Sequence, residues 1–313
     1  MTITQFQYVL AVAKYKNFTT AAENSFVTQP TLSMQIQKLE EELGVVIFDR
    51  SKKPLQITEI GKQIIKQAQI IVNESERMRD IVSQEKGAVG GEFRVGIIPT
   101  ASSTLLPMFL TNFIHKYPKI CLKIEEQNTE TIIQKIEDGS YDAAIIATPL
   151  HNPNIVEKPL YYEPFVAYIP DNHRLQKHKT IYSEDLDIND ILMLEDGHCF
   201  KESVLNICNQ DIVESKKHFQ LKSGSFETLI KLANEGLGMT LLPYLHSLEL
   251  KESEKKYIHS FAEPQPAREI SLIHHKNELK MQIIKALHDS ISGVIRGAIA
   301  FHNVKIISPT RKK

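Results

Sequence analysis

Apolar residues recur at helical spacing in the stretch 25–44, SFVTQPTLSMQIQKLEEELG, and predict a helix with one buried face. The buried positions are Leu32, Ile36, Leu39 and Leu43. Thr28 is a suitable N-cap, Pro30 lies in the first turn, where its missing N–H costs nothing, and Gly44 ends the helix. A shorter helix starts at 19–22, so this part of the chain is typical of a helix-turn-helix.

Basic residues follow this helix in a loop between two short strand-like pieces, FDRSKKPLQITEIG. Such a loop suits a wing that contacts phosphates. The alternative is a plain three-helix packing unit, which would not need basic residues in this loop. Acidic and basic residues nearly balance over residues 1–66, so contacts with base edges would have to supply specificity. The candidate DNA-binding residues are Gln29, Pro30, Thr31, Ser33, Gln35, Lys38, Arg50, Lys52 and Lys53.

A long helical stretch without proline runs from Thr58 to about Glu85. Its apolar positions recur in alternating steps of four and three, close to a heptad, which favours a dimerising linker helix over a core helix of one domain. GAVGG then supplies a flexible boundary. The predicted domains are a winged helix-turn-helix at 1–62, a linker helix at 63–88 and an effector domain at 89–313.

Buried strands and amphipathic helices alternate after this boundary. FRVGIIPT, CLKIEEQ and YDAAIIAT read as strands, and helices from about Thr104 and at TETIIQKIEDG separate them, which predicts a parallel sheet. The order repeats in FVAYIP, DILMLEDG, HFQLKSG and MTLLP, and REISLIHH with a helix over about 278–299 returns to the first part. We therefore predict an α/β fold with two lobes and a ligand site at strand ends or between the lobes. Lobe I covers about 89–162 and 268–300, and lobe II about 163–267.

The composition limits the class of protein. Hydrophobic residues make up 42% and charged residues 24%, as in ordinary globular proteins, and the net charge of −1 means that any basic surface is local. Neither a signal peptide nor a membrane span of about 20 apolar residues is apparent. Three cysteines argue against an extracellular disulfide framework. We expect a cytoplasmic protein with reduced thiols and no membrane partner, metal or cofactor.

Two cysteines lie nine positions apart in LEDGHCFKESVLNICNQ. Cys199 would lie near a helix N-terminus, beside His198 and close to Lys201, which favours the reactive thiolate. Cys208 falls on the apolar face of the same helix, so it is expected to be buried. A continuous helix would separate the two Cα atoms by about 13 Å. A disulfide needs them within about 7 Å, so bonding would have to unwind or bend the helix.

Simpler explanations of these residues remain open at this point. The two cysteines could be neighbours by chance, one in the core and one in a turn. A zinc site is a weaker option, because no CxxC pair is present. Its possible ligands are His198, Cys199, Cys208 and His218. Cys121 alternates with apolar residues in a strand and is interpreted as structural.

The segment NFTTAAENSFVTQPTLSMQIQKLEEELGVVIFDR, followed by ITEIG, resembles the winged-helix signature of LysR-type transcriptional regulators over most of residues 1–62. The two predicted lobes resemble the periplasmic-binding-protein-like effector domain of that family. The resemblance implies a homodimer or homotetramer that binds double-stranded promoter DNA in adjacent major grooves and acts on RNA polymerase. Met34 departs from the pattern, since many members carry Arg there. The resemblance therefore does not imply a base or phosphate contact at Met34.

LMLEDGHC, the cysteine nine residues later and SFETLIKLANEGLGMTLLP are similar to the peroxide-sensing members of this family, which FRVGIIPT and EEQNTET also match. This resemblance implies that Cys199 reacts with hydrogen peroxide and that Cys208 resolves the product. The implied peroxide-binding residues are Thr100, Thr129, His198 and Cys199. Peroxide would convert Cys199 to a sulfenic acid, Cys208 would close a disulfide, and thioredoxin or glutaredoxin would reduce it.

These observations together predict a hydrogen-peroxide-sensing transcriptional regulator of oxidative-stress genes that is not an enzyme. One alternative is a LysR-type regulator that binds a small organic anion at the Ser102-Ser103-Thr104 turn, with the cysteines incidental. The other is a thiol peroxidase, which the helix-turn-helix disfavours.

Overall fold

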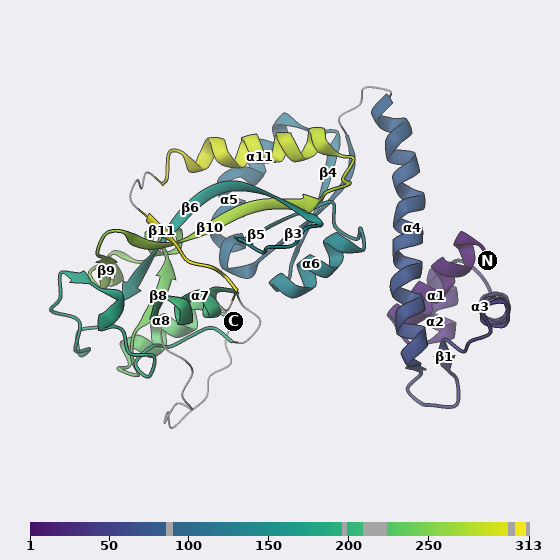
Figure 1. Ribbon diagram of the computed structural model, residues 1–313, viewed down its shortest axis with the longest axis horizontal. Coiled ribbons are helices and arrows are strands. Elements are labelled where there is room, and N and C mark those ends of the chain that lie inside the picture. Colours follow the sequence, from purple (N-terminus) through teal and green to yellow (C-terminus); the bar gives the residue numbers. More distant parts are fainter. Residues whose placement is uncertain (86–89, 196–198, 209–223, 300–303, 311–313) are drawn as a thin grey trace. The chain divides into compact units, whose positions relative to one another are not determined.

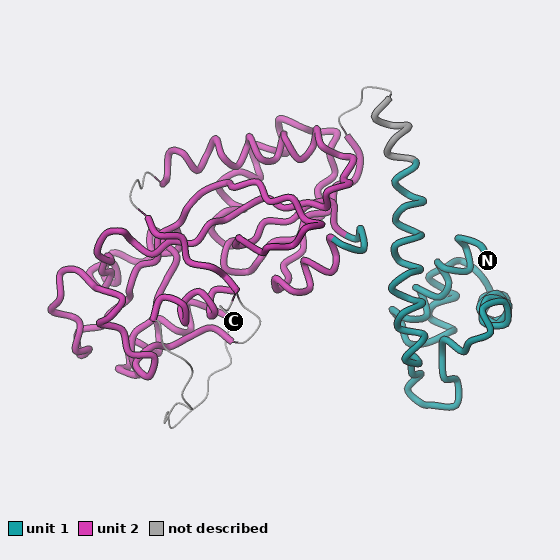
Figure 2. The backbone as a smooth tube through the Cα atoms, viewed as in Figure 1, with its two compact units in different colours: residues 1–88, 137–140 teal, residues 89–136, 141–313 magenta. Residues whose placement is uncertain are grey.

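A computed structural model describes residues 1–85, 90–195, 199–208, 224–299 and 304–310 (Figure 1). The chain divides into two compact units (Figure 2). The first unit comprises residues 1–88 with 137–140, and the second comprises 89–136 with 141–313.

The first unit is a helix-turn-helix with a two-stranded wing. Its elements are α1 Ile3–Tyr15, α2 Phe18–Asn24, α3 Gln29–Leu43, β1 Phe48–Asp49, β2 Gln56–Ile57 and α4 Glu59–Glu85. Thr28 caps α3 as predicted, because its side chain accepts from the Thr31 N–H, and Gly44 ends the helix with a φ of 67°. The predicted buried face of α3 is confirmed at Leu32, Ile36 and Leu39, whereas Leu43 is only half-buried.

A glycine anchors the start of α4 against the rest of this unit. A Cβ atom on Gly61 would lie 2.3 Å from the Ile47 carbonyl oxygen, so any side chain would push the backbone apart. The Thr58 hydroxyl accepts from the Gly61 N–H at 2.9 Å and donates to the Val46 carbonyl at 2.7 Å. The ITEIG motif therefore ties the linker helix to the segment between α3 and the wing.

The second unit is built on one curved sheet. Its strands are β3 Gly91–Ile97, β4 Ile120–Glu126, β5 Ala143–Thr148, β6 Ile155–Tyr168, β7 Thr180–Ile181, β8 Thr240–Pro243, β9 Ile258–Phe261, β10 Gln265–His275 and β11 Val304–Ile306. Their order is β4-β3-β5-β10-β6-β9-β7, with β8 paired to β6 and β11 to β10. β3, β4 and β5 run parallel, as predicted, and β10 is antiparallel to β5 and β6.

Helices cover this sheet on both sides. They are α5 Pro99–Lys116, α6 Thr129–Glu137, α7 Cys199–Cys208, α8 Phe226–Asn234, α9 Tyr244–Leu248, α10 Glu252–Lys255 and α11 Met281–Ile295, with a 3-10 helix at Ser183–Asp185. Figure 1 shows α11 and α6 on opposite sides of the sheet. The long strands β6 and β10 pair along most of their length and connect two separate hydrophobic cores.

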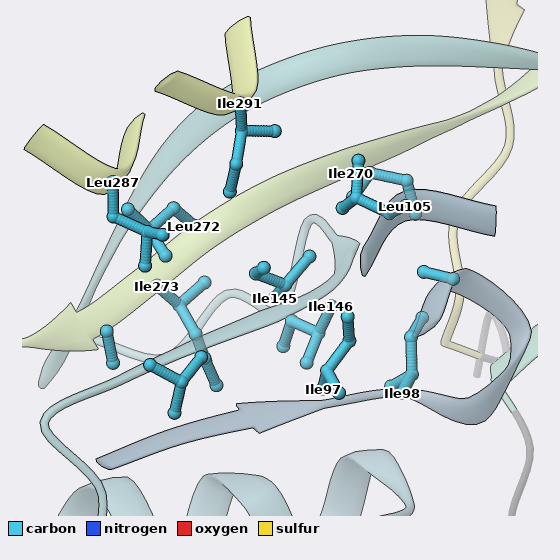
Figure 3. Packing of buried hydrophobic residues seen from close by; sticks show 14 of the residues in the cluster. Ile97, Ile98, Leu105, Ile145, Ile146, Ile270, Leu272, Ile273, Leu287 and Ile291 are labelled. Carbon is cyan, nitrogen blue, oxygen red and sulfur yellow. The ribbon is translucent and has the colours of Figure 1, made fainter. Parts of the chain in front are cut away.

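Each core collects side chains from a different part of the sheet. The first core gathers isoleucine and leucine side chains of β3, β5, β10, α5 and α11 (Figure 3). The second core gathers the C-terminal half of β6 with β8, α7 and α8. This arrangement confirms the predicted α/β class with a periplasmic-binding-protein-like effector domain.

Some predicted elements are wrong in extent. The helix expected from about Thr104 begins five residues earlier, because Pro99 is pre-organised for a first helical turn. DILMLEDG is not a strand: in its described part, only Ile191 forms an isolated bridge, with Met239. HFQLKSG lies outside the described residues except for Gly224. Cys121 lies on the edge strand β4, as the strand pattern predicted, and its side chain is exposed there.

Candidate functional site

Three parallel strands deliver polar groups to one edge of the sheet. β3 leads into Thr100 in the first turn of α5, β4 leads into Thr129 at the start of α6, and β5 carries Ala147 near its end. The carboxyl ends of parallel strands are where α/β sheets bind ligands. Cys199, the first residue of α7, packs into the first core, which these strands build.

Arg268 lies at the centre of this edge and is 2% exposed. Its Nε and Nη2 donate to the Glu163 carboxylate at 2.9 and 2.7 Å, and Glu163 is itself 1% exposed. Nη1 donates to the Thr100 hydroxyl and Nη2 to the Thr100 carbonyl, both at 2.9 Å. Burial works against the Arg268 charge, but Glu163 more than compensates, so the pKa of Arg268 lies above its ordinary value. A buried cation therefore persists here at every physiological pH.

The sequence reasoning missed Arg268. The signal in the sequence was the charged pair Arg268 and Glu269 at the start of the strand segment AREISLIHH, because charged residues are rare in buried strands. Its guanidinium also lies over the ring of Phe200 on α7, with 5.5 Å between the guanidinium carbon and the ring centroid. Arg268 thus contacts α5, β6 and α7 at once.

The Cys199 thiol is buried, and its surroundings shift its pKa in opposite directions. Burial raises the pKa of this thiol, whereas the Thr129 hydroxyl, the Arg268 charge and the Ala147 backbone lower it without reversing the rise. The helix N-terminus and Lys201 were predicted to favour the thiolate, but burial gives the Cys199 pKa a net upward shift in this fold. The charge that acts on the thiol comes from Arg268.

Two threonine hydroxyls remain available for a ligand. Thr129 Oγ1 is buried and, within the described part of the chain, has no hydrogen-bond partner apart from the weakly bonding thiol of Cys199. Thr100 Oγ1 accepts from Arg268, so its own proton is free to donate. Both predicted threonines therefore belong to the network around the thiol. His198 lies outside the described residues.

Cys208 lies at the other end of α7, in the second core. Its predicted burial is confirmed, and burial raises the pKa of its thiol to about 12. The two cysteines therefore belong to different cores although one helix carries both. Nine helical steps separate their Cα atoms by about 13 Å, so the disulfide and this helix exclude one another.

We expect the protected thiols to label slowly and with a steep pH dependence. Exposed Cys121 should react with iodoacetamide first, while Cys208 should still gain rate between pH 9 and 11, because its thiolate fraction rises about tenfold per pH unit below its raised pKa. In the unfolded chain the Cys208 thiol ionises near its ordinary pKa of 9.0, whereas in the fold it keeps its proton to higher pH. The free energy of unfolding should therefore fall as the pH rises from 9 towards 12. Peptide mass spectrometry after timed alkylation measures each site. Equal labelling of Cys208 and Cys121 at pH 8 would contradict this burial.

The alternative anion site has a different environment from the one predicted. Ser102 donates to the carboxylate of Glu126, and Thr104 donates to the Ala101 carbonyl at 3.3 Å within its own helix. A carboxylate at this turn repels an anionic ligand.

Most predicted DNA-binding residues lie on exposed surface of the first unit. Gln29, Pro30, Thr31 and Lys38 are exposed on α3, and Lys52 and Lys53 are exposed in the wing loop. Ser33 and Gln35 are half-buried instead: Arg50 donates to Ser33 at 2.9 Å, and Gln5 donates to Gln35 at 3.3 Å. Arg50 also pairs with Glu40 at 3.1 Å and stacks on Phe18. Arg50 therefore braces the wing against α3.

The described residues contain neither a candidate metal site nor a membrane-spanning helix. No group of three or more His, Cys, Asp or Glu side chains there could hold a metal ion. Across the same ranges, no helix is both long and apolar enough to cross a membrane.

Comparison with known proteins gives matches over both units. The family model described as bacterial regulatory helix-turn-helix protein, lysR family, matches residues 3–62, and the LysR substrate binding domain matches residues 86–295. The hydrogen peroxide-inducible genes activator of Dickeya chrysanthemi is 31% identical over 93% of this chain and 95% of its own. The DNA-binding transcriptional dual regulator OxyR of Escherichia coli K12 is 28% identical over 98% of this chain and 99% of its own.

Solved structures agree with these matches. A full-length OxyR variant from Pseudomonas aeruginosa superimposes with a TM-score of 0.74 at 32% identity, covering 93% of this chain and 94% of that one. An OxyR mutant from Corynebacterium glutamicum, solved with bound H2O2, gives 0.57 at 26% identity over 96% and 97% of the two chains.

Proposed function

The chain belongs to the LysR family of bacterial transcriptional regulators, and on that premise we propose that it is a hydrogen-peroxide sensor that controls transcription by binding double-stranded DNA. The observation that carries the proposal is the position of Cys199. Its thiol lies against the Thr129 hydroxyl and within reach of the Arg268 charge, and Cys208 ends the same helix. Relatives named for peroxide induction align over nearly the whole chain, which supports the same function.

The first chemical step is attack of the Cys199 thiolate on one peroxide oxygen. An S–O bond forms, the O–O bond breaks, and hydroxide leaves, so Cys199 is oxidised to a sulfenic acid and the peroxide is reduced. Thr129 and Thr100 donate hydrogen bonds to the two peroxide oxygens and stabilise the departing hydroxide. Arg268 stabilises the thiolate by charge, while His198 completes the predicted peroxide-binding set.

The second step is condensation with Cys208. Its thiol attacks the sulfenic sulfur, a disulfide forms, and water leaves. Because Cys208 is held in the second core, it reaches Cys199 only when α7 unwinds. The change in the second unit then alters how subunits pair and how the DNA-binding units are spaced.

The remaining partners follow from this function. The protein acts in the cytoplasm as a homodimer or homotetramer, contacts RNA polymerase at promoters, and is reset by thioredoxin or glutaredoxin. Sensing consumes one peroxide per oxidation and is not enzymatic turnover. A thiol peroxidase would instead sustain turnover with a reductant and bind no specific DNA.

The decisive experiment is peroxide oxidation of the reduced full-length protein, followed by intact mass and thiol mapping. After one equivalent of hydrogen peroxide, the wild type should lose two thiols and yield a crosslinked Cys199–Cys208 peptide. Cys208→Ser should trap a dimedone-reactive sulfenic acid at Cys199. Cys121→Ser is the matched control and should behave as the wild type.

If Cys199 stays reduced at micromolar peroxide, the sensor proposal fails. The alternative of a regulator for a small organic anion would then gain support from calorimetry. In that case a Cys199→Ser/Cys208→Ser double variant would bind such an anion as tightly as the wild type.

A further inference from the structure

Phe26 occupies a backbone conformation that disfavours it. It lies in the turn between α2 and α3 with a φ of 55°, in the left-handed region that Gly or Asn normally fills at a helix end. Its side chain is 95% exposed, so it adds almost nothing to the hydrophobic core. Neither the left-handed backbone nor the exposed ring of Phe26 stabilises the fold. Strain that the fold does not use points to a function.

Met34 is the second exposed apolar residue of this region. The buried face of α3 is centred on Leu32 and Ile36, and Met34 lies about 200° around the helix from Leu32 at about 100° per residue. Its side chain is 49% exposed and projects opposite the core. Pro30 and Lys38, one turn before and after it, are exposed on the same face. Met34 therefore occupies the middle of the outward face of α3.

The charges on α3 leave DNA recognition dependent on other contacts. Lys38 is the only cationic residue between Gln29 and Leu43, whereas three consecutive glutamates follow it in the last turns. Electrostatic attraction from this helix is therefore weak. In a helix-turn-helix, the N-terminal part of the second helix meets base edges in the major groove. The apolar feature that the major groove offers is the C5-methyl group of thymine.

We propose, on the basis of the function proposed above, that Met34 reads a thymine methyl group and that Phe26 packs against the adjacent sugar-phosphate backbone. Met34 then determines sequence preference at one position of each half-site. Phe26 lies in the turn before the helix, where contacts position a protein on the duplex without reading sequence. Its effect is therefore uniform across sequences.

The test is in vitro selection from randomised duplexes with the full-length wild type, Met34→Ala and Phe26→Asn. Met281→Ala, at an exposed methionine at the start of α11, is the matched control. Each thymine of the selected site is then replaced by deoxyuridine, which removes only the methyl group. Affinities are measured by fluorescence anisotropy at one salt concentration.

Wild type and Met281→Ala should lose about fourfold in affinity at one uracil position of each half-site, the value of one buried methyl group. Met34→Ala should bind the thymine site about fourfold more weakly and be insensitive to that uracil. Phe26→Asn should weaken binding by about tenfold on every sequence, without lowering the melting temperature, because Asn tolerates the left-handed backbone.

Specific outcomes would overturn the inference. If Met34→Ala keeps the uracil sensitivity of the wild type, Met34 reads no methyl group. If Phe26→Asn binds DNA normally and melts at a lower temperature, Phe26 is structural. If the wild type selects no sequence at all, the proposed DNA-binding function itself fails. That result is distinct from a selected site without methyl sensitivity, which overturns only the present inference.

Discussion

Replacing Arg268 by leucine is expected to destabilise the second unit by about 3–5 kcal/mol and to slow oxidation of Cys199 at least tenfold. The loss of stability arises because the carboxyl group of Glu163, 1% exposed, would lose the cation that it pairs with in the interior. The loss of reactivity arises because the Arg268 charge opposes the rise in the pKa of Cys199 that burial causes. Urea unfolding and stopped-flow peroxide oxidation measure the two effects.

A double variant separates these two roles. In Arg268→Leu/Glu163→Gln, glutamine still accepts from the Leu245 N–H, which Glu163 holds at 2.9 Å, and no unpaired charge remains. Most of the lost stability should return, while oxidation of Cys199 should stay slow. If the double variant regains wild-type oxidation rates, Arg268 positions the fold and contributes nothing to the chemistry of the thiol.

Disulfide formation is expected to unwind α7 and to raise amide hydrogen exchange over residues 200–208 by on the order of 100-fold. The helix cannot persist because it holds the Cα atoms of Cys199 and Cys208 about 13 Å apart, about twice what a disulfide permits. Phe200 and Val204 would leave the second core in the process. Hydrogen exchange with mass spectrometry on reduced and oxidised full-length protein measures this change.

Peroxide-treated Cys208→Ser is the control for this change. It forms the sulfenic acid but no disulfide, so its exchange over α7 should stay close to that of the reduced wild type. Oxidised wild type that keeps full protection of residues 203–208 would show that the bond forms without unwinding, against the geometry of the helix.

Much of the architecture was predictable from the sequence, because periodicity and caps act over a few residues. The stripe on α3, the Thr28 cap and the strand–helix alternation from β3 to β5 each depend on neighbours within one or two turns. The predicted boundaries of helices and strands were wrong where two local sequence signals favour different structures. Pro99 starts α5 five residues before the start predicted near Thr104, and the apolar run around Ile191 resembles a strand but forms only one isolated bridge in its described part.

The sequence by itself determined the class of fold, the helix-turn-helix and the spacing of Cys199 and Cys208, because all three depend on patterns of neighbouring residues. Only the tertiary structure determined which charged side chain acts on the Cys199 thiol. Arg268 and Glu163 are 105 residues apart and pair because β10 lies beside β6. It also decided the direction of the Cys199 pKa shift. Desolvation depends on every segment that packs around a group, and no single segment of sequence contains that sum.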